Sequence, residues 1–412
     1  MSYIKGKDKK LTVGFFSPGW PPETTQNGVV TYVSSIVDGL SELGHQSHIF
    51  APPFRKQSPT QTAIDITRGR PSDFFEKLHT RINSEIYYAN DFAKNVQRNI
   101  KTLEKTSRLD LFEMEESMGL PHFLKRRINT PIITRLHGPW FLNGAILGLQ
   151  TDDAFTRRVQ REGKAIAEAL AISAPSRNVL ELTREYYGLP LEEAVVIPYP
   201  IASVPKTQQW KIETCDRNLI VFIGRFDRHK GGDLMIDAFA KTIRQKPDLK
   251  LCFIGPDRGF KDNYGRVWQL EEYIQERLPN ALEKGQISWL GAQPPQTLRE
   301  MRLRAYLTVV PSRYETFGYT ALEALSQGCP IVGADSGGIP EIISDGITGQ
   351  LFRSGDSEDL AIKITHLLNN PEVVAKMGEQ AGQNCERRFS LKAIAQQSLD
   401  FYHEVLERHI AS

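Results

Sequence analysis

Short apolar runs rich in β-branched residues alternate with helical patterns along most of the chain, and this alternation restricts the fold more than any other feature of the sequence. In the first half, the runs lie at 11–18, 46–52, 109–115, 131–138, 171–176 and 195–200. The segment GVVTYVSSIVDGLSELG, between the first two runs, has the spacing of an amphipathic helix that ends at Gly44. A strand–helix repeat of this kind is typical of a parallel sheet covered by helices on both faces.

The alternation stops in the polar segment 201–217 and then starts again, which predicts a linker between two similar domains. The second set of apolar runs lies at 218–226, 249–255, 287–291, 305–312, 329–335 and 349–355. A chain of 412 residues is too long for one ordinary hydrophobic core. We therefore predict two Rossmann-like, doubly wound α/β domains, 1–200 and 218–389, that face each other across a cleft. A final helix at 390–412 is expected to cross back onto the first domain.

Composition and charge exclude several classes of protein. The formal net charge is +2 and neither half is strongly basic, which argues against a nucleic-acid-binding protein. The four cysteines are widely spaced without a CxxC motif, which predicts free thiols rather than disulfides or a zinc site. The start of the chain, MSYIKGKDKK, lacks the apolar run of a secretory signal, and no segment approaches the length of a membrane span. We therefore expect a cytoplasmic protein, and its small basic clusters are compatible with peripheral contact with the inner face of a membrane.

Ligands of doubly wound folds bind beyond the carboxyl ends of the strands, so the loops there are the candidate sites. The run at 218–226 leads into GRFDRHKGGD, in which Gly224 permits a tight turn. Arg225 and Lys230 supply two cations just before a helix start, which suits a diphosphate. The alternative is an ordinary surface arginine and lysine near a helix. After the run at 329–335, Gly337 and Gly338 permit close approach of the backbone to a ligand.

Two loops of the first domain are further candidates. The first reads SPGWPPETTQNGVV and ends in Asn27-Gly28 before a helix, which makes it either a helix N-terminus aimed into the cleft or a plain connection. The run at 131–138 ends in His137-Gly138. A histidine at a strand end faces the cleft, or else it is a hydrogen-bonded structural residue. No GxGxxG motif occurs, which disfavours a dinucleotide oxidoreductase.

The stretch PSRYETFGYTALEALSQG at 311–328 carries two glutamates, Glu315 in a loop and Glu323 in the helix that follows. Glu315 is expected to point into the cleft. Glu323 has Ala and Leu on both sides in the helix, so we expect its side chain to be buried rather than exposed to solvent. A buried carboxylate needs partners, and the two hydroxyls of a ribose would serve.

These residues resemble the retaining glycosyltransferases of family 4, which have the GT-B fold. The resemblance rests on E-x7-E after PS, followed by the CPIVGAD strand and the SGGIPE loop, and it runs nearly end to end. Two motifs depart from the family pattern: Asn27-Gly28 stands where GG is common, and Tyr199-Pro200 stands where an N-G turn is common. The other matching motifs are GVVTYV at 28–33, GH at 44–45, HG at 137–138, GRFDRHKG at 224–231, FIG at 253–255, LG at 290–291 and DGITG at 345–349.

The resemblance implies a nucleotide-sugar donor that is held mainly by the second domain. It assigns the diphosphate to Arg225 and Lys230 and the ribose hydroxyls to Glu323. It assigns hydroxyls of the transferred sugar to Glu315. It also implies donor contacts, largely through the backbone, at Gly224, Gly255, Leu290, Gly291, Thr316, Phe317 and Gly318.

In the first domain, the resemblance implies that Gly28 approaches the diphosphate and that His137 lies beside the donor sugar and the acceptor. The catalytic residues are then Arg225, Lys230, His137 and Glu315. The expected reaction transfers a hexose, with UDP-glucose as the favoured donor, to a hydroxyl of a saccharide or lipid-linked acceptor in polysaccharide or glycoconjugate synthesis.

We expect the acceptor hydroxyl to attack from the face that the diphosphate leaves, while cations stabilise the leaving group. The chain has no D-x-D motif, so we expect no metal and no cofactor. Three alternatives stay open. A nucleotide-sugar epimerase would need no acceptor, a catalytically silent nucleotide-sugar-binding protein would release no nucleotide, and a two-lobed solute-binding protein would need an export signal.

Overall fold

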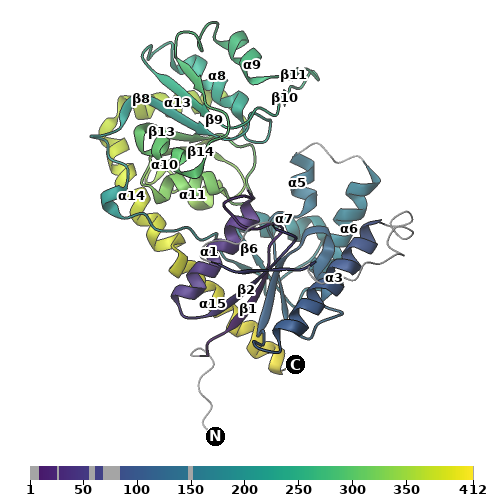
Figure 1. Cartoon of the computed structure of the whole chain (residues 1–412). Helices are drawn as coiled ribbons and strands as arrows, with labels where there is room; N and C mark the ends of the chain where they lie inside the picture. The colour runs from purple at the N-terminus through teal and green to yellow at the C-terminus, as the bar shows by residue number, and fades with distance from the viewer. Residues whose placement is uncertain (1–8, 26, 55–60, 68–83, 147–151, 412) are drawn as a thin grey trace. The chain divides into compact units, whose positions relative to one another are not determined.

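The computed structural model describes residues 9–25, 27–54, 61–67, 84–146 and 152–411. The chain forms two compact units. Unit 1 comprises the residues up to Pro200 together with those from Leu391 onward, and unit 2 comprises Ile201–Ser390 (Figure 1). Each unit is a parallel sheet covered by helices, as the alternating sequence pattern predicts.

The sheet of unit 1 has seven parallel strands within the described residues, in the order β3-β2-β1-β4-β5-β6-β7. Six of them coincide with predicted runs. The three-residue strand β3 was not predicted, because it is too short to show a pattern. The strands are β1 (Thr12–Phe16), β2 (Gln46–Ala51), β3 (Ala63–Asp65), β4 (Leu111–Glu115), β5 (Ile132–Arg135), β6 (Ala171–Ala174) and β7 (Val195–Val196).

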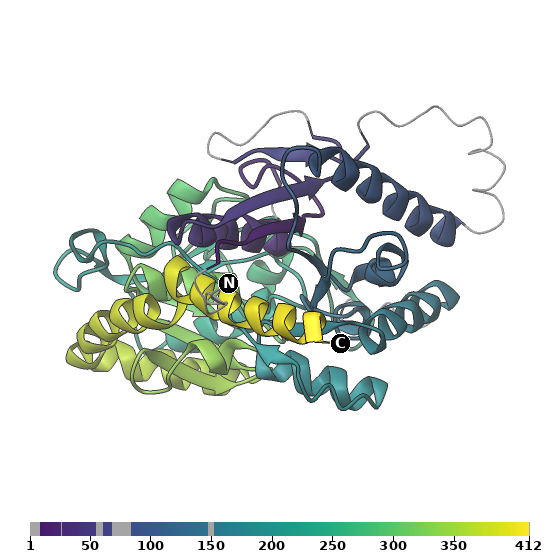
Figure 2. The same cartoon turned by 90° about the horizontal axis from the view of Figure 1, so that it is seen from below.

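Helices cover both faces of this sheet. The N-terminus of α1 is capped by the Asn27 side chain, and α1 packs against α15 from the end of the chain. On the opposite face, α3 contributes Phe92 to a core cluster with Phe16 and Phe112 of the sheet, and Figure 2 shows α3 lying along the strands. The helices are α1 (Gly28–Glu42), α3 (Ser84–Leu103), α4 (Leu120–Leu124), α5 (Trp140–Ile146), α6 (Asp153–Ala167), α7 (Arg177–Tyr187) and α15 (Leu391–Ala411).

The main sheet of unit 2 has six parallel strands, in the order β12-β9-β8-β13-β14-β15. All six were predicted, and the strand order doubles back at β8 as in a doubly wound fold. A short antiparallel hairpin, β10 (Phe260–Lys261) with β11 (Val267–Trp268), was not predicted. The main strands are β8 (Asp216–Ile223), β9 (Lys250–Ile254), β12 (Ile287–Trp289), β13 (Ala305–Val310), β14 (Ile331–Asp335) and β15 (Gly349–Arg353).

The helices of unit 2 form two groups: α8 packs against α13, and α11 packs against α14. The polar segment 201–217 belongs to unit 2, because Trp210 is buried and its indole N–H donates to the Ala305 carbonyl at 2.7 Å. None of the helices in the described ranges is both long and apolar enough to cross a membrane. The helices are α8 (Gly232–Thr242), α9 (Leu270–Arg277), α10 (Pro295–Arg304), α11 (Tyr319–Ser326), α12 (Ile339–Ile342), α13 (Ser357–Asn369) and α14 (Pro371–Phe389).

Candidate functional site

The carboxyl ends of five neighbouring strands of unit 2 bring most of the predicted site residues to one edge of the sheet. Gly224 follows β8, and its N–H donates to the Ile254 carbonyl of β9 at 2.9 Å. Gly255 follows β9, and its N–H donates to the Gly291 carbonyl after β12 at 2.8 Å. Leu290, beside Gly291, is 40% exposed, which leaves an apolar side chain open at this edge. The glycine turn at Gly224, the predicted donor contacts Gly255, Leu290 and Gly291, and the loop that carries the two cations are therefore neighbours.

Both predicted cations of the loop 224–231 are paired with carboxylates. The Arg225 Nε lies 2.6 Å from Asp227 Oδ2, and the Lys230 Nζ lies 2.6 Å from Glu315 Oε1. Asp227 also accepts a hydrogen bond from the Lys230 backbone N–H at 2.7 Å, which holds the loop in a turn. The loop therefore presents its charges at fixed positions.

Glu315 lies in the loop between β13 and α11, as predicted, and its side chain is 13% exposed. Burial acts to raise the pKa of this carboxyl, but the charges of Lys230 and His229 and the hydrogen bonds from Lys230 and Ser312 outweigh it. The pKa of Glu315 is therefore lower than its ordinary value. Glu315 is thus an ionised carboxylate whose counter-ion is a residue that we assign to the diphosphate.

The residues Thr316, Phe317 and Gly318 complete this loop. Phe317 is buried, with 1% of its surface exposed, and it anchors the loop to the core of unit 2. Gly318 precedes α11 with φ of 116°, a left-handed conformation that favours glycine. The Gly318 carbonyl accepts the Leu322 N–H at 3.1 Å as the helix begins.

An arginine that the sequence reasoning did not single out joins the two loops. Arg313 makes a bidentate ion pair with Asp233 in the first turn of α8, at 2.8 and 2.6 Å. Its backbone N–H donates to the His229 carbonyl at 2.9 Å. Bidentate arginine–carboxylate pairs fix geometry as well as charge. Its position inside the PSRYE motif is the one feature of the sequence that could have identified Arg313 as part of this site.

Gly337 allows a close backbone contact, but the contact is with Glu315 and not with a ligand. We expected Gly337 and Gly338 to admit a ligand, but a Cβ atom on Gly337 would lie 2.0 Å from the Glu315 carbonyl oxygen. Its φ is +58°, and the N–H of Gly338 donates to the same Glu315 carbonyl at 2.8 Å. The loop after β14 therefore supports the backbone of Glu315.

Glu323 is more exposed than the sequence predicted. We expected a buried carboxylate, but 38% of its side chain is exposed, because only the flanking Ala and Leu residues of α11 face the core. Its carboxylate pairs with Arg302 of α10, whose side chain is 2% exposed. No local sequence pattern indicates this pair, since Arg302 lies on another helix in a charged segment.

His137 lies just beyond β5 in unit 1 and is 9% exposed. Its Nδ1 is 2.7 Å from the Tyr199 hydroxyl, and its backbone N–H donates to the Glu116 carboxylate at 2.9 Å. Burial, aided by the charge of Arg135, lowers the pKa of His137 far below its ordinary value. His137 is therefore a neutral imidazole that is hydrogen-bonded to its surroundings, as expected of a structural histidine, and its role beside the donor stays a prediction.

The aromatic and charged residues behind His137 form a buried cluster, here called the Glu113 cluster. The Glu113 carboxylate accepts from the hydroxyls of Tyr32, at 2.6 Å, and Tyr402, at 2.8 Å. The guanidinium of Arg135 lies 4.3 Å from the centre of the Tyr32 ring and donates to the Ile197 carbonyl at 2.7 Å. The cluster joins β4, β5, α1 and α15.

Gly28 is exposed and is the first residue of α1. The Asn27 side chain accepts the Val29 N–H at 2.8 Å, which is an ordinary N-cap. The helix N-terminus that we predicted is therefore present at the carboxyl edge of the unit 1 sheet.

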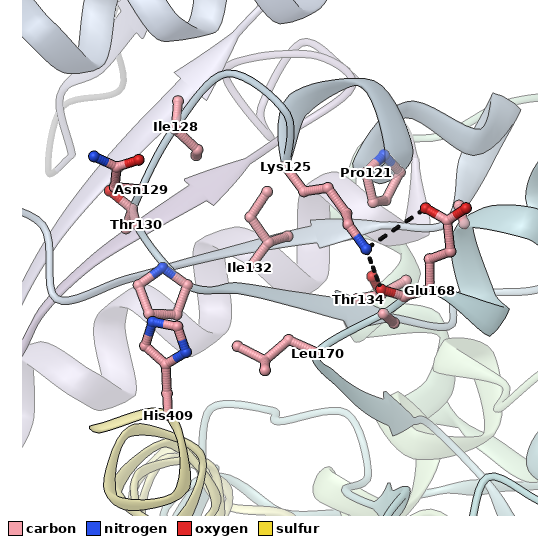
Figure 3. A pocket seen from close by; sticks show the side chains of 13 residues that line it. Pro121, Lys125, Ile128, Asn129, Thr130, Ile132, Thr134, Glu168, Leu170 and His409 are labelled. Atoms are coloured by element: carbon pink, nitrogen blue, oxygen red, sulfur yellow. Dashed lines mark hydrogen bonds and ion pairs between the residues drawn. The ribbon is translucent and has the colours of Figure 1, made fainter. Parts of the chain in front are cut away.

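Two of the cavities in unit 1 lie at different edges of its sheet. One, of about 390 Å³, is bordered by Met118, which follows β4, and by Trp140, which follows β5. The guanidinium of Arg158 covers the Trp140 ring at 3.8 Å. The other, of about 470 Å³, lies at the amino-terminal start of β5, where Figure 3 shows Lys125 directed toward Glu168. Only the first cavity is at the edge where doubly wound folds bind ligands.

Acidic, histidine and cysteine side chains do not gather in groups of three or more that could hold a metal ion in the described ranges. All four cysteines are free, as predicted, and three of them are buried.

Two sequence families match the chain in succession: Glycosyltransferase Family 4 over residues 26–202 and Glycosyl transferases group 1 over residues 206–384. The D-inositol 3-phosphate glycosyltransferase of Segniliparus rotundus is 27% identical over 291 residues, which cover 69% of this chain and 63% of that protein. The segments matched in two proteins of that name, from Corynebacterium aurimucosum and Corynebacterium kroppenstedtii, span 44% and 41% of their lengths.

Solved structures resemble the whole chain. The sucrose-phosphate synthase of Thermosynechococcus elongatus has a TM-score of 0.70 at 18% identity, and the likeness covers 97% of this chain and 100% of that one. Anabaena HepE in complex with UDP and glucose has a TM-score of 0.65 at 16% identity, covering 95% and 98%. With both halves matched in sequence and the architecture shared, the chain belongs to the family 4 glycosyltransferases and has the GT-B fold.

Proposed function

We propose that this chain is a retaining glycosyltransferase that transfers a hexose from a nucleotide sugar to a hydroxyl of a saccharide or lipid-linked acceptor. The observation that carries the proposal is the placement of Arg225, Lys230 and Glu315 at one edge of the unit 2 sheet. Two cations beside the carboxylate of Glu315 match a ligand that has a diphosphate next to the hydroxyls of a sugar. A phosphate ion would need only the cations, and a free sugar would need only the carboxylate.

UDP-glucose is the favoured donor in this proposal. HepE, which shares the fold, was solved with UDP and glucose, although likeness at 16% identity speaks for the architecture alone. In this chain, Leu290 offers an exposed apolar side chain beside Gly291, which suits the face of a base. The panel of nucleotide sugars described below identifies the base of the donor.

The chemistry we propose needs no metal ion. As the bond between the anomeric carbon and the diphosphate oxygen breaks, negative charge grows on the diphosphate. Arg225, Lys230 and the N-terminus of α8 would stabilise that charge, and one such interaction is typically worth about 3 kcal/mol. The acceptor hydroxyl would lose its proton to a diphosphate oxygen on the same face, which retains the anomeric configuration.

Donor binding would also rearrange the ion pair between Lys230 and Glu315. A diphosphate near the Lys230 ammonium competes with the Glu315 carboxylate for the same protons. Glu315 would then be available to accept hydrogen bonds from hydroxyls of the transferred sugar. The pair thus keeps the lysine positioned until the donor arrives.

We further propose that the acceptor binds in the cavity beside Trp140 and Arg158 in unit 1. The Arg158 guanidinium, stacked on the Trp140 ring, is suited to the hydroxyls of a sugar, and the cavity volume of about 390 Å³ accommodates one or two rings. In this proposal, acceptor selection lies mostly in unit 1, in the segments at about 53–108 and 140–160. Parts of them, at 55–60, 68–83 and 147–151, lie outside the described residues. Contributions of Gly28 and His137 to the donor site stay predictions.

A panel of nucleotide sugars, scored for release of free nucleotide with and without a mixed saccharide acceptor, tests the proposal. We expect release from one UDP-sugar, strongly accelerated by acceptor, and a glycosidic product with the donor's anomeric configuration. Isomerised nucleotide sugar without acceptor would identify an epimerase instead. Tight binding of a nucleotide sugar with neither product would identify a silent binding protein.

A further inference from the structure

The ion pair between Arg302 and Glu323 is unusual in where its two ends lie. Arg302 is in the last turn of α10 and is buried, whereas Glu323 is in the second turn of α11 with 38% of its side chain exposed. The Arg302 Nη2 donates to Glu323 Oε2. The pair therefore buries the cation and leaves the carboxylate partly open to solvent.

This arrangement does not serve the stability of the fold well. A buried arginine needs a counter-charge and a partner for each of its N–H groups, but the Nε of Arg302 is buried without a hydrogen-bond partner in the described structure. An apolar side chain of similar volume would fill the same space without an unpaired donor. The position of Arg302 is better explained by what it does to Glu323.

Arg302 fixes one oxygen of the Glu323 carboxylate and leaves the other available. Within the described residues, Arg302 is the partner that contacts this carboxylate. An exposed glutamate side chain alone samples several rotamers, and holding it costs conformational entropy. A guanidinium fixed by packing removes that freedom before a ligand arrives.

We propose that Arg302 is a positioning residue that aims the Glu323 carboxylate at the ribose hydroxyls of the nucleotide donor. The inference rests on the proposed function, since it takes Glu323 as the ribose ligand. The free oxygen of Glu323 accepts a hydrogen bond from one hydroxyl, and the shared oxygen can accept from its neighbour. The chain therefore distinguishes a ribonucleotide from its 2′-deoxy form through a residue that does not itself contact the nucleotide.

The test measures the dissociation constants of UDP and 2′-deoxy-UDP by titration calorimetry, so that it does not depend on catalysis. Wild-type protein is expected to prefer UDP by about tenfold, the value of one hydrogen bond to a charged group. Arg302→Met should reduce that preference to about threefold or less while the affinity for 2′-deoxy-UDP stays within about twofold. Glu323→Ala, which lacks the carboxylate, shows how much preference for UDP remains without it.

Arg304→Gln, an exposed residue of the same helix, is the matched control and should keep the wild-type preference. If Arg302→Met does not fold by circular dichroism, Arg302→Lys and Arg302→Gln are measured in the same way. A wild-type preference in a folded Arg302 variant overturns the inference and leaves the proposed function intact. If the wild-type protein binds none of UDP, GDP and ADP, the proposed function itself fails, and the inference fails with it.

Discussion

The ammonium of Lys230 lies 2.6 Å from the carboxylate of Glu315, 85 residues further along the chain. The two loops that carry them follow β8 and β13, which are neighbouring strands of the same sheet. A cation assigned to the leaving group and a carboxylate assigned to the transferred sugar thus hold each other in place. Ionisation, folding and catalysis should all respond to changes in this pair.

Replacing Lys230 by alanine should reduce turnover by about 100-fold, the usual effect of removing one group that stabilises transition-state charge. Lys230 is also the counter-ion of Glu315, so its loss should lower the midpoint of thermal unfolding as well, and the comparison is made well below that midpoint. The measurement is kcat with the donor that the panel identifies. Arg228→Ala, exposed in the same loop, is the control, and an unchanged kcat in Lys230→Ala would remove Lys230 from the site.

The stability that Glu315 provides should depend on pH in a defined direction. The folded-state pKa of Glu315 lies below the ordinary value of 4.5, because Lys230, His229 and two hydrogen bonds outweigh the opposing effect of burial. The ionised carboxylate therefore favours the folded state above pH 4.5, and that contribution is lost as the pH falls through the folded pKa. The difference in unfolding free energy between wild type and Glu315→Gln should shrink between neutral pH and pH 4 or below. Glu300→Gln, at an exposed position, should show no such trend.

Activity should survive removal of divalent metal. The two cations Arg225 and Lys230 are proposed to take the charge that a metal ion would otherwise neutralise. Initial rates measured with 5-fold excess EDTA over total divalent metal should match, within about twofold, those measured with added Mg²⁺ or Mn²⁺. A strict requirement for either ion would contradict the metal-independent mechanism.

Gly337→Ala should damage both folding and donor binding, because a Cβ atom there would lie 2.0 Å from the Glu315 carbonyl oxygen. Gly346→Ala is a matched control, since Gly346 also has a positive φ, +72°, but no atom lies within 4 Å of its Cβ position. In both variants, the left-handed backbone conformation of alanine should lower the free energy of unfolding by about 1 kcal/mol. Only Gly337→Ala should lose more than that in unfolding free energy and also weaken nucleotide binding. Equal losses in the two variants would show that the contact with Glu315 is unimportant.

Tyr402→Phe should destabilise unit 1 by about 1–3 kcal/mol, because it removes one of the two hydroxyls that satisfy the buried Glu113 carboxylate. The two partners lie 2.8 Å apart although they are 289 residues apart in sequence. Urea unfolding followed by circular dichroism gives the change. Tyr264→Phe, at a side chain that is 97% exposed, should be neutral, and an equally neutral Tyr402→Phe would mean that water replaces the lost hydroxyl.

The sequence predicted the parallel strands well because each is a buried run of β-branched and aromatic residues, as in β8 and β13. It did not predict β3 or the β10–β11 hairpin, whose strands have three and two residues and too few positions for a pattern. The sequence also did not predict that the segment 201–217 packs onto unit 2. A single large side chain, Trp210, anchors this otherwise polar segment, and one residue makes no pattern.

For the site, the sequence placed Arg225, Lys230 and Glu315 in the correct loops, because strand ends are visible as the ends of apolar runs. It could not predict which of them pair. The bond from Lys230 to Glu315 and the bond from Arg302 to Glu323 each join different elements, and no local pattern encodes such contacts. The expected burial of Glu323 was wrong because Ala and Leu on both sides of a helix position do not fix which way that position faces.

The last helix of the chain has a consequence for the order in which the protein is completed during translation. Glu113 is made early, but its partner Tyr402 emerges from the ribosome only after the whole of Ile201–Ser390 has been synthesised. Unit 2 is contiguous and can fold as soon as it emerges, whereas the Glu113 carboxylate of unit 1 lacks the Tyr402 hydroxyl until α15 has been made. The part of the protein that begins synthesis first is therefore the part that finishes folding last.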